Sequence, residues 1–134
     1  MLSDSQTNIP PPIKHVIVAP VPRVDEDANE LGGVPVVLRD APLGSYFGWN
    51  ITQAGFHRNQ NCDYVGGMVP FSVTAAERKQ NGDPRLSLEE RYHNHDRYVD
   101  AVRVAANKAM AAGFLLFDDR EKLIEQAKDS NVLK

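Results

Sequence analysis

The stretch Pro42-Leu43-Gly44-Ser45-Tyr46-Phe47-Gly48-Trp49-Asn50 decides how the rest of this chain is interpreted. It carries the only tryptophan of the sequence together with two further aromatic residues. It also separates proline-rich, β-branched segments from charged, alanine-rich ones. Its two glycines allow backbone conformations that a Cβ atom would forbid, so the stretch is predicted to be a tight loop rather than a helix.

Two interpretations of this stretch remain open on physical grounds. In the first, the aromatic rings dock the loop on a core, where each ring buries about 150–250 Å². In the second, Tyr46 and Trp49 form an apolar pocket wall, and Asn50 supplies the polar group that orients a small molecule. The candidate substrate-binding residues are therefore Tyr46, Trp49 and Asn50.

The composition is that of an ordinary globular domain. The 134 residues suffice for one domain, and 42% of them are hydrophobic and 25% charged. The formal net charge of −3 disfavours a nucleic-acid partner. The single cysteine excludes an intramolecular disulfide. The sequence shows no signal peptide and no apolar run of the ~20 residues that cross a membrane, so a cytoplasmic location is only the default expectation and the location stays unknown.

Working outward toward the N-terminus, residues 1–14 are predicted to be a disordered tail or linker because they are polar and rich in proline. Residues 15–130 form the expected folded region. Two β-branched segments, 16–24 and 34–38, flank an acidic turn and a glycine pair, which predicts a proline-bounded β-hairpin. Residues 51–71 show no periodicity and are predicted to be a long irregular loop.

Toward the C-terminus the pattern becomes helical. Capping boxes start helices at Thr74 and Ser87, a long helix covers about 94–112, and Asp118 is expected to cap the last one. The segment 114–117 is too apolar for an exposed linker and is expected to pack. The long helix should bury Tyr98, Val102, Ala105, Ala106 and Ala109, and the last helix Leu123, Ile124 and Ala127. The predicted fold class is α/β, incomplete and fragment-like, with an N-terminal β-hairpin, long irregular loops and C-terminal helices.

Motifs for catalysis or cofactor binding are missing from the sequence. The stretch 44–48 resembles the Gly-x-Ser-x-Gly elbow of serine hydrolases, but its serine stands one place early. Cys62 has His57 near it in sequence, and an inert cysteine is the favoured interpretation. His93 and His95 would point about 200° apart on a helix and could not share one ion. The sequence therefore predicts no catalytic residue, no metal site and no cofactor.

Several short motifs together resemble a known family. In chain order they are Val21-Pro22-Arg23-Val24-Asp25, Pro42-Leu43-Gly44, Gly48-Trp49-Asn50, Pro70-Phe71, Gly82-Asp83-Pro84-Arg85 and Ser87-Leu88-Glu89-Glu90-Arg91-Tyr92. In this order and spacing, residues 21 to about 127 resemble the C-terminal region of bacterial alpha/beta hydrolase domain-containing proteins. Two positions depart from that pattern. Ala28 stands where the family's turn usually has glycine, and Phe47 stands where a smaller polar residue is usual.

The resemblance implies an esterase-type serine hydrolase whose nucleophilic serine, and also its triad histidine, lie upstream of the residues seen here. The chain is then expected to be the C-terminal part of such a hydrolase, from a split or truncated reading frame, and inactive alone. Its partner would be the upstream hydrolase portion or a second copy. The alternative is a stand-alone binding or complementation module that joins another chain. A metal enzyme built on His93 and His95 is a remote third hypothesis.

Overall fold

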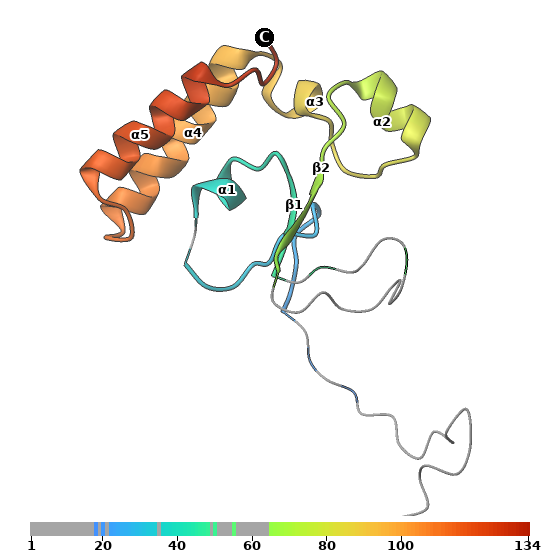
Figure 1. Cartoon of the computed structure of the whole chain (residues 1–134), viewed down its shortest axis with the longest axis horizontal. Coiled ribbons are helices and arrows are strands. Elements are labelled where there is room, and N and C mark those ends of the chain that lie inside the picture. The colour runs from blue at the N-terminus through green and yellow to red at the C-terminus, as the bar shows by residue number, and fades with distance from the viewer. Residues whose placement is uncertain are drawn as a thin grey trace, which may run out of the picture.

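The computed structural model describes residues 22–34, 36–48 and 65–134, with single positions at 18, 20, 50 and 55. Within them a two-stranded antiparallel sheet precedes a set of helices (Figure 1), which confirms the mixed, fragment-like α/β class. The elements in chain order are α1 (Val37–Asp40), β1 (Gly44–Phe47), β2 (Gly67–Pro70), α2 (Ala75–Asn81), α3 (Leu88–Tyr92), α4 (His95–Ala111) and α5 (Phe117–Asp129).

The strand pair lies later in the chain than the sequence predicts. β1 comes from the stretch that we expected to be a tight loop, and it pairs with β2 so that Gly44 faces Pro70 and Phe47 faces Gly67. The described residues of the segment 34–38 are not in a strand, and Val37 and Leu38 belong to α1. Much of the other expected strand, 16–24, lies outside the described residues, and the described part forms an isolated bridge between Val24 and Glu30. The physical reason is tertiary: β propensity depends strongly on context, and α1 is held against α4 by its contacts there.

The outer edge of β1 is completed by one side chain. Phe71 N donates to Leu43 O at 3.0 Å, and this register turns the backbone groups of Gly44 and Tyr46 away from β2. The amide of Asn29 meets both of them, since its Nδ2 donates to Gly44 O at 3.2 Å and its Oδ1 accepts from Tyr46 N at 2.8 Å. Asn29 is buried, so its side chain replaces a neighbouring strand.

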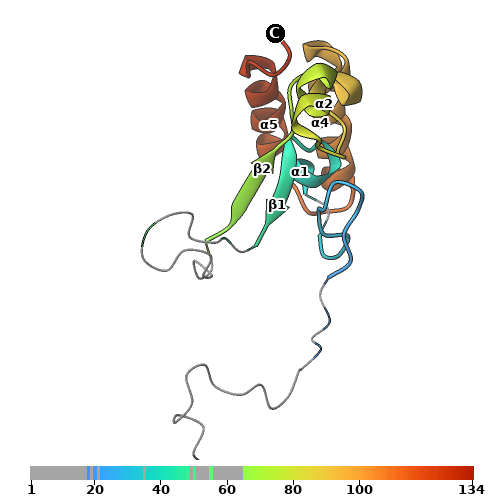
Figure 2. The ribbon, with the colours of Figure 1, turned by 90° about the vertical axis from the view of Figure 1, so that its right-hand side faces the viewer.

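Close backbone contact fixes the residue type at the start of β1. A Cβ atom on Gly44 would lie 2.5 Å from Val69 O and 2.9 Å from Pro70 Cα. Both neighbours are backbone atoms, which cannot swing aside as a flexible side chain can. Figure 2 shows the two strands running side by side away from the helices.

The helix starts follow the predicted caps with one exception. Thr74 Oγ1 accepts from Glu77 N at 3.2 Å, Ser87 forms a complete capping box with Glu90, and Asn94 caps α4. Gly113 follows α4 with a φ of 79°, as expected for a residue just beyond a helix C-terminus. The predicted cap at Asp118 is wrong, because α5 starts at Phe117 and Asp118 lies in its first turn, where its charge still favours the helix dipole.

The core forms between α4 and α5 and extends to the sheet. The expected face of α4 is buried, and so are Ile124 and Ala127 of α5, while Leu123 is half-buried. Tyr92 donates its hydroxyl hydrogen to Pro42 O at 2.8 Å and thereby joins α3 to the segment before β1. Burial raises the pKa of the Tyr92 hydroxyl, and it raises the pKa of the Tyr98 hydroxyl as well.

The apolar segment between α4 and α5 does not pack as expected. Phe114 is 58% exposed, Leu116 73% and Phe117 63%, and only Leu115 is half-buried. α4 and α5 pack against each other with Ile124 and Ala127 buried, and this packing does not extend over Phe114, Leu116 and Phe117. Among the described residues no helix is long and apolar enough to cross a membrane.

We predict that Gly44→Ala lowers the free energy of unfolding by about 1–3 kcal/mol, because the new methyl group collides with the backbone of β2. The matched control is Gly48→Ala, since a Cβ at Gly48 meets nothing within 4 Å. The control should change stability by less than about 0.5 kcal/mol. Urea denaturation of the two variants measures the difference, and equal midpoints would contradict the close approach.

We also predict that Asn29→Asp lowers the free energy of unfolding by about 1–3 kcal/mol or more, because the carboxylate keeps the acceptor but faces Gly44 O without a donor. The same substitution at exposed Asn107 serves as the control, since Asn107 Oδ1 only accepts, from Arg120 Nε at 2.5 Å. Thermal unfolding compares the two. A melting temperature of Asn29→Asp equal to that of Asn107→Asp would show that the edge does not depend on the Asn29 amide.

Candidate functional site

The three residues predicted to bind a substrate are described only in part. Tyr46 is half-buried in β1, and its hydroxyl accepts a hydrogen bond from Leu43 N at 3.3 Å. Asn50 is exposed, and Trp49 lies outside the described residues. The pocket wall therefore stays a prediction. Tyr46 also has a structural role, because this hydrogen bond stabilises the turn that leads into β1.

Ser45, the serine of the near-miss elbow, is a buried structural residue. It is 2% exposed, its hydroxyl donates to the carbonyl oxygen of Asp27, and it accepts from Arg85 Nη1 at 2.8 Å. Neither partner can serve as a general base, because one is a backbone carbonyl and the other a guanidinium. Ser45 therefore links the turn before α1 to the loop before α3.

Arg85 donates hydrogen bonds to two backbone carbonyl oxygens of β2. Its Nη1 donates to Val69 O at 3.0 Å, and its Nη2 donates to Pro70 O at 3.3 Å. The same guanidinium forms a two-point ion pair with Asp83, at 2.9 Å from Nε and 2.6 Å from Nη2. Hydrogen bonding from Arg85 lowers the pKa of Asp83 to about 2, and the carboxylate in turn raises the pKa of Arg85.

A second arginine reaches the same region from α3. Arg91 Nη2 donates to Asp27 Oδ1 at 2.6 Å, and its Cζ lies 4.6 Å from the centroid of the buried Phe71 ring. Arg85 Cζ lies 5.2 Å from the same centroid. We call Asp27, Ser45, Asp83, Arg85 and Arg91 the arginine cluster. The sequence analysis missed it, although the motifs 82–85 and 87–92 contain both arginines.

In the acidic turn, a side-chain carboxylate accepts hydrogen bonds from the backbone of the turn itself. Asp25 Oδ1 accepts from Asp27 N at 2.9 Å and from Asn29 N at 2.8 Å. Between them Ala28 has a φ of 62°, which is the left-handed region. In this conformation a residue with a Cβ atom is less stable than glycine by about 1–2 kcal/mol. This difference explains why the family that the chain resembles usually has glycine at this position. The turn thus presents Asn29 to β1.

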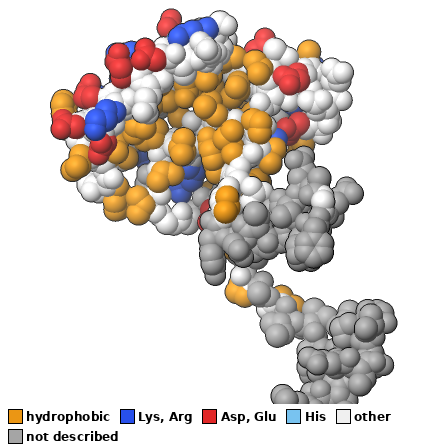
Figure 3. All heavy atoms as spheres, viewed as in Figure 1, with side chains coloured by type: hydrophobic (Ala, Val, Ile, Leu, Met, Phe, Trp, Pro, Cys, Tyr) orange, Lys and Arg blue, Asp and Glu red, His pale blue; other side chains and the backbone are white. Residues whose placement is uncertain are grey.

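An apolar groove lies between α1 and the two long helices, and we call it the α1–α5 groove. Its larger cavity holds about 230 Å³, and an adjoining cavity of about 130 Å³ shares Val37, Leu38 and Leu123 with it. Figure 3 shows apolar side chains gathered on this face of the molecule. The larger cavity is lined only by apolar residues, namely Val34, Val36, Val37, Leu38, Ala109, Phe114, Leu115 and Leu123.

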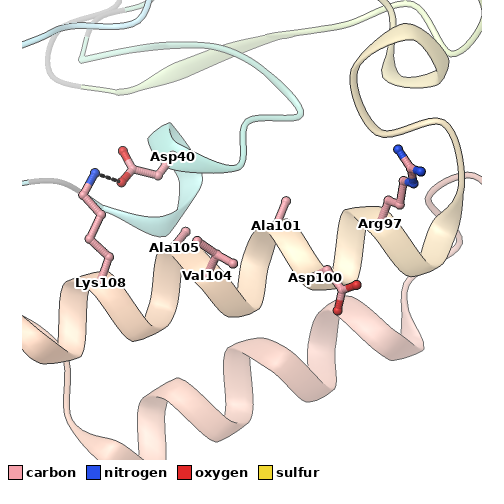
Figure 4. A pocket seen from close by; sticks show the side chains of 7 residues that line it. All are labelled: Asp40, Arg97, Asp100, Ala101, Val104, Ala105 and Lys108. Carbon is pink, nitrogen blue, oxygen red and sulfur yellow. Dashed lines mark hydrogen bonds and ion pairs between the residues drawn. The ribbon is translucent and has the colours of Figure 1, made fainter.

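A second, open groove runs along α4, and we call it the α4 groove (Figure 4). It holds about 600 Å³ and is lined by Asp40, Arg97, Asp100, Ala101, Val104, Ala105 and Lys108. Lys108 Nζ lies 2.7 Å from Asp40 Oδ2 at one end. At the other end Asp100 pairs with Arg103, while the guanidinium of Arg97 has no partner among the described side chains.

The two histidines at the start of α4 do not form a metal site within the described residues. His93 is exposed and has a φ of 66°. The ring nitrogens of His95 lie 2.8 Å from Val132 O and 3.1 Å from Lys128 O. His95 therefore has a structural role, since its ring ties α4 to the C-terminal residues.

Comparison with known proteins identifies one family. The family model described as alpha/beta hydrolase domain matches residues 4–125, which is most of the chain and begins upstream of the motifs quoted above. Comparison with curated proteins gives no match. Comparison with solved structures gives none either.

We predict that Asp83→Asn lowers the melting temperature at pH 7 and reduces the loss of stability in acid. The pKa of Asp83 falls from 3.8 to about 2 on folding, so its stabilising contribution is complete above pH 3.8 and is lost as the pH falls toward 2. The melting temperatures of variant and parent should therefore converge near pH 2. Asp119→Asn is the control, because its pair with Lys122 is exposed and contributes little. If the melting temperatures of Asp83→Asn and the parent stayed the same distance apart at every pH, the coupling of Asp83 to Arg85 would be contradicted.

Proposed function

The chain belongs to the alpha/beta hydrolase domain family, and we propose that it forms the C-terminal part of an esterase-type serine hydrolase without a catalytic serine of its own. In this proposal the chain completes the core and supplies part of the pocket wall. The nucleophile-bearing portion of the hydrolase is its partner, and it binds over the α1–α5 groove.

The observation that carries this proposal is the exposed apolar surface around that groove. Leu38 and Phe114 line the groove, whose cavities are almost entirely apolar, and each of these two side chains is more than half exposed. Leu116 and Phe117, which follow Phe114 in the chain, are also more than half exposed. Single exposed apolar residues are normal, whereas a contiguous patch is typical of an interaction site. Burial of a leucine or phenylalanine stabilises by about 1.5–3 kcal/mol, so covering this patch would contribute much of the binding free energy.

The hydroxyl groups of three described serines support the same proposal. Ser45 is held between Asp27 and Arg85, Ser87 donates to Glu90 Oε2 at 2.7 Å, and Ser130 donates to Ala127 O at 2.7 Å. None of these bonds reaches a histidine. Because a serine nucleophile needs a neighbouring base, these residues serve the fold, and the nucleophile is assigned to the partner.

The proposed pocket wall consists of Tyr46, Trp49 and Asn50. The strand that carries Tyr46 is anchored on both sides, by the Asn29 amide at its outer edge and by pairing with β2. A binding residue on a rigid element holds its position better than one on a free loop. Trp49 and Asn50 follow Tyr46 within four residues, so the same anchored strand fixes where their segment begins.

Complementation in trans tests the proposal. Alone, the chain should hydrolyse a short-chain nitrophenyl ester no faster than buffer, and hydrolysis should rise above that level when the nucleophile-bearing portion of a family hydrolase is added. Leu38→Glu should abolish the gain, because it places a charge in the α1–α5 groove. Val104→Glu is the matched control, since Val104 is exposed on the α4 groove, and it should leave complementation intact.

Tryptophan emission separates the proposal from the stand-alone alternative. With tryptophans of the partner portion replaced by phenylalanine, Trp49 should emit as an exposed, readily quenched indole alone and shift to the blue on mixing. Emission of a buried indole in the isolated chain would favour the stand-alone module. Ester hydrolysis by the chain alone that disappears in folded Ser45→Ala would contradict the assignment of the nucleophile to the partner.

A further inference from the structure

The outer face of α4 departs from the pattern of a solvent-exposed helix. Charged and polar residues occupy most of it, yet Val104 at its centre is 66% exposed. Val104 lies beside Ala101 and Ala105 on the floor of the α4 groove (Figure 4). Arg97, Ala101, Val104 and Lys108 follow one another at intervals of four, three and four residues, which is the spacing of a helix–helix seam.

The ends of this seam carry charges in a definite order. At the N-terminal end Arg97 precedes Asp100 by one turn, and Arg97 has no side-chain partner among the described residues. About 16 Å along the helix, Lys108 pairs with Asp40. Arg39 Nε approaches Asp40 Oδ1 only to 3.5 Å, so this oxygen can still accept a strong hydrogen bond.

We propose that the α4 groove binds a second copy of this chain, with the two α4 helices antiparallel about a two-fold axis. The axis passes near Val104, where small side chains allow the helices to approach to about 8–10 Å. It brings Arg97 of each copy to Asp40 of the other, and Asp100 to Lys108. A parallel arrangement would instead oppose Arg97 to Arg97, so the charge order selects the closed antiparallel dimer.

This dimer is independent of the hydrolase assembly proposed above. The α4 groove shares no lining residue with the larger cavity of the α1–α5 groove, so both partners can bind at once. One helix pair buries less than the ~1,200 Å² of a standard interface. The dimer is therefore reversible and depends on concentration.

Sedimentation equilibrium of the full chain tests the surface. The parent should show a monomer–dimer equilibrium, and Val104→Arg should raise its dissociation constant at least tenfold. Leu38→Arg alters the α1–α5 groove instead, and its dimer dissociation constant should stay within twofold of the parent's. Circular dichroism confirms that both variants keep their helices. The test uses this chain alone, so failed complementation by a hydrolase portion would not affect its outcome.

Exchanging the charges tests the geometry. In a dimer of Arg97→Glu, the introduced glutamate opposes Asp40 of the other copy at both ends of the seam. In a dimer of Asp40→Lys, the introduced lysine opposes Arg97 of the other copy in the same way. Like charges repel at both ends in either case, so each variant alone should be monomeric.

Mixing the two variants should restore the dimer. At one end of the mixed dimer the introduced glutamate meets the introduced lysine, and at the other end the original Arg97 meets the original Asp40, so a heterodimer should appear. A parent that stays monomeric up to millimolar concentration, a dimer that survives Val104→Arg, or a mixture that stays monomeric would overturn the proposal.

Discussion

The amide of Asn29 is the contact on which the described fold depends most directly. A two-stranded sheet is marginal in water because both its edges expose backbone groups. Here the buried side chain of Asn29 meets the outward groups of Gly44 and Tyr46, and so does for the outer edge of β1 what a flanking strand does in a larger sheet. Arg85 adds donors to the carbonyl oxygens of Val69 and Pro70 and to the hydroxyl of Ser45, and so ties the two strands together.

This arrangement explains why the acidic turn between Asp25 and Asn29 has a demanding geometry. Asp25 holds the turn by accepting two backbone hydrogen bonds, and Ala28 adopts a left-handed conformation so that Asn29 can point at β1. The arginine cluster then fixes the turn from the other side, through Arg91 and Asp27. The acidic turn is therefore the support of the sheet.

The parts that sequence predicted well are those fixed by neighbours in the chain. Helix starts at Thr74, Ser87 and Asn94 depend on hydrogen bonds spanning three residues, and the buried face of α4 depends on its periodicity. The strands were misplaced because β1 and β2 meet only through contacts between distant segments. Arg85 and Ser45, forty residues apart, show the same limit, since no local pattern announces their contact. The candidate pocket wall stays a prediction because Trp49 lies outside the described residues.

The side chains on the two faces of α4 account for both proposed interaction surfaces. Its inner face includes the small residues Ala105, Ala106 and Ala109 and packs chiefly against α5. α1 and the segment 114–117 therefore keep exposed apolar area. Its outer face combines Val104 with charges at both ends. If α4 carried large apolar residues on its inner face only, they would cover the α1–α5 groove, and the α4 groove would be lined by polar residues alone. Small residues instead leave one face for the proposed hydrolase portion and another for the proposed second copy. We infer different partners for the two faces because only the second one is lined by charges.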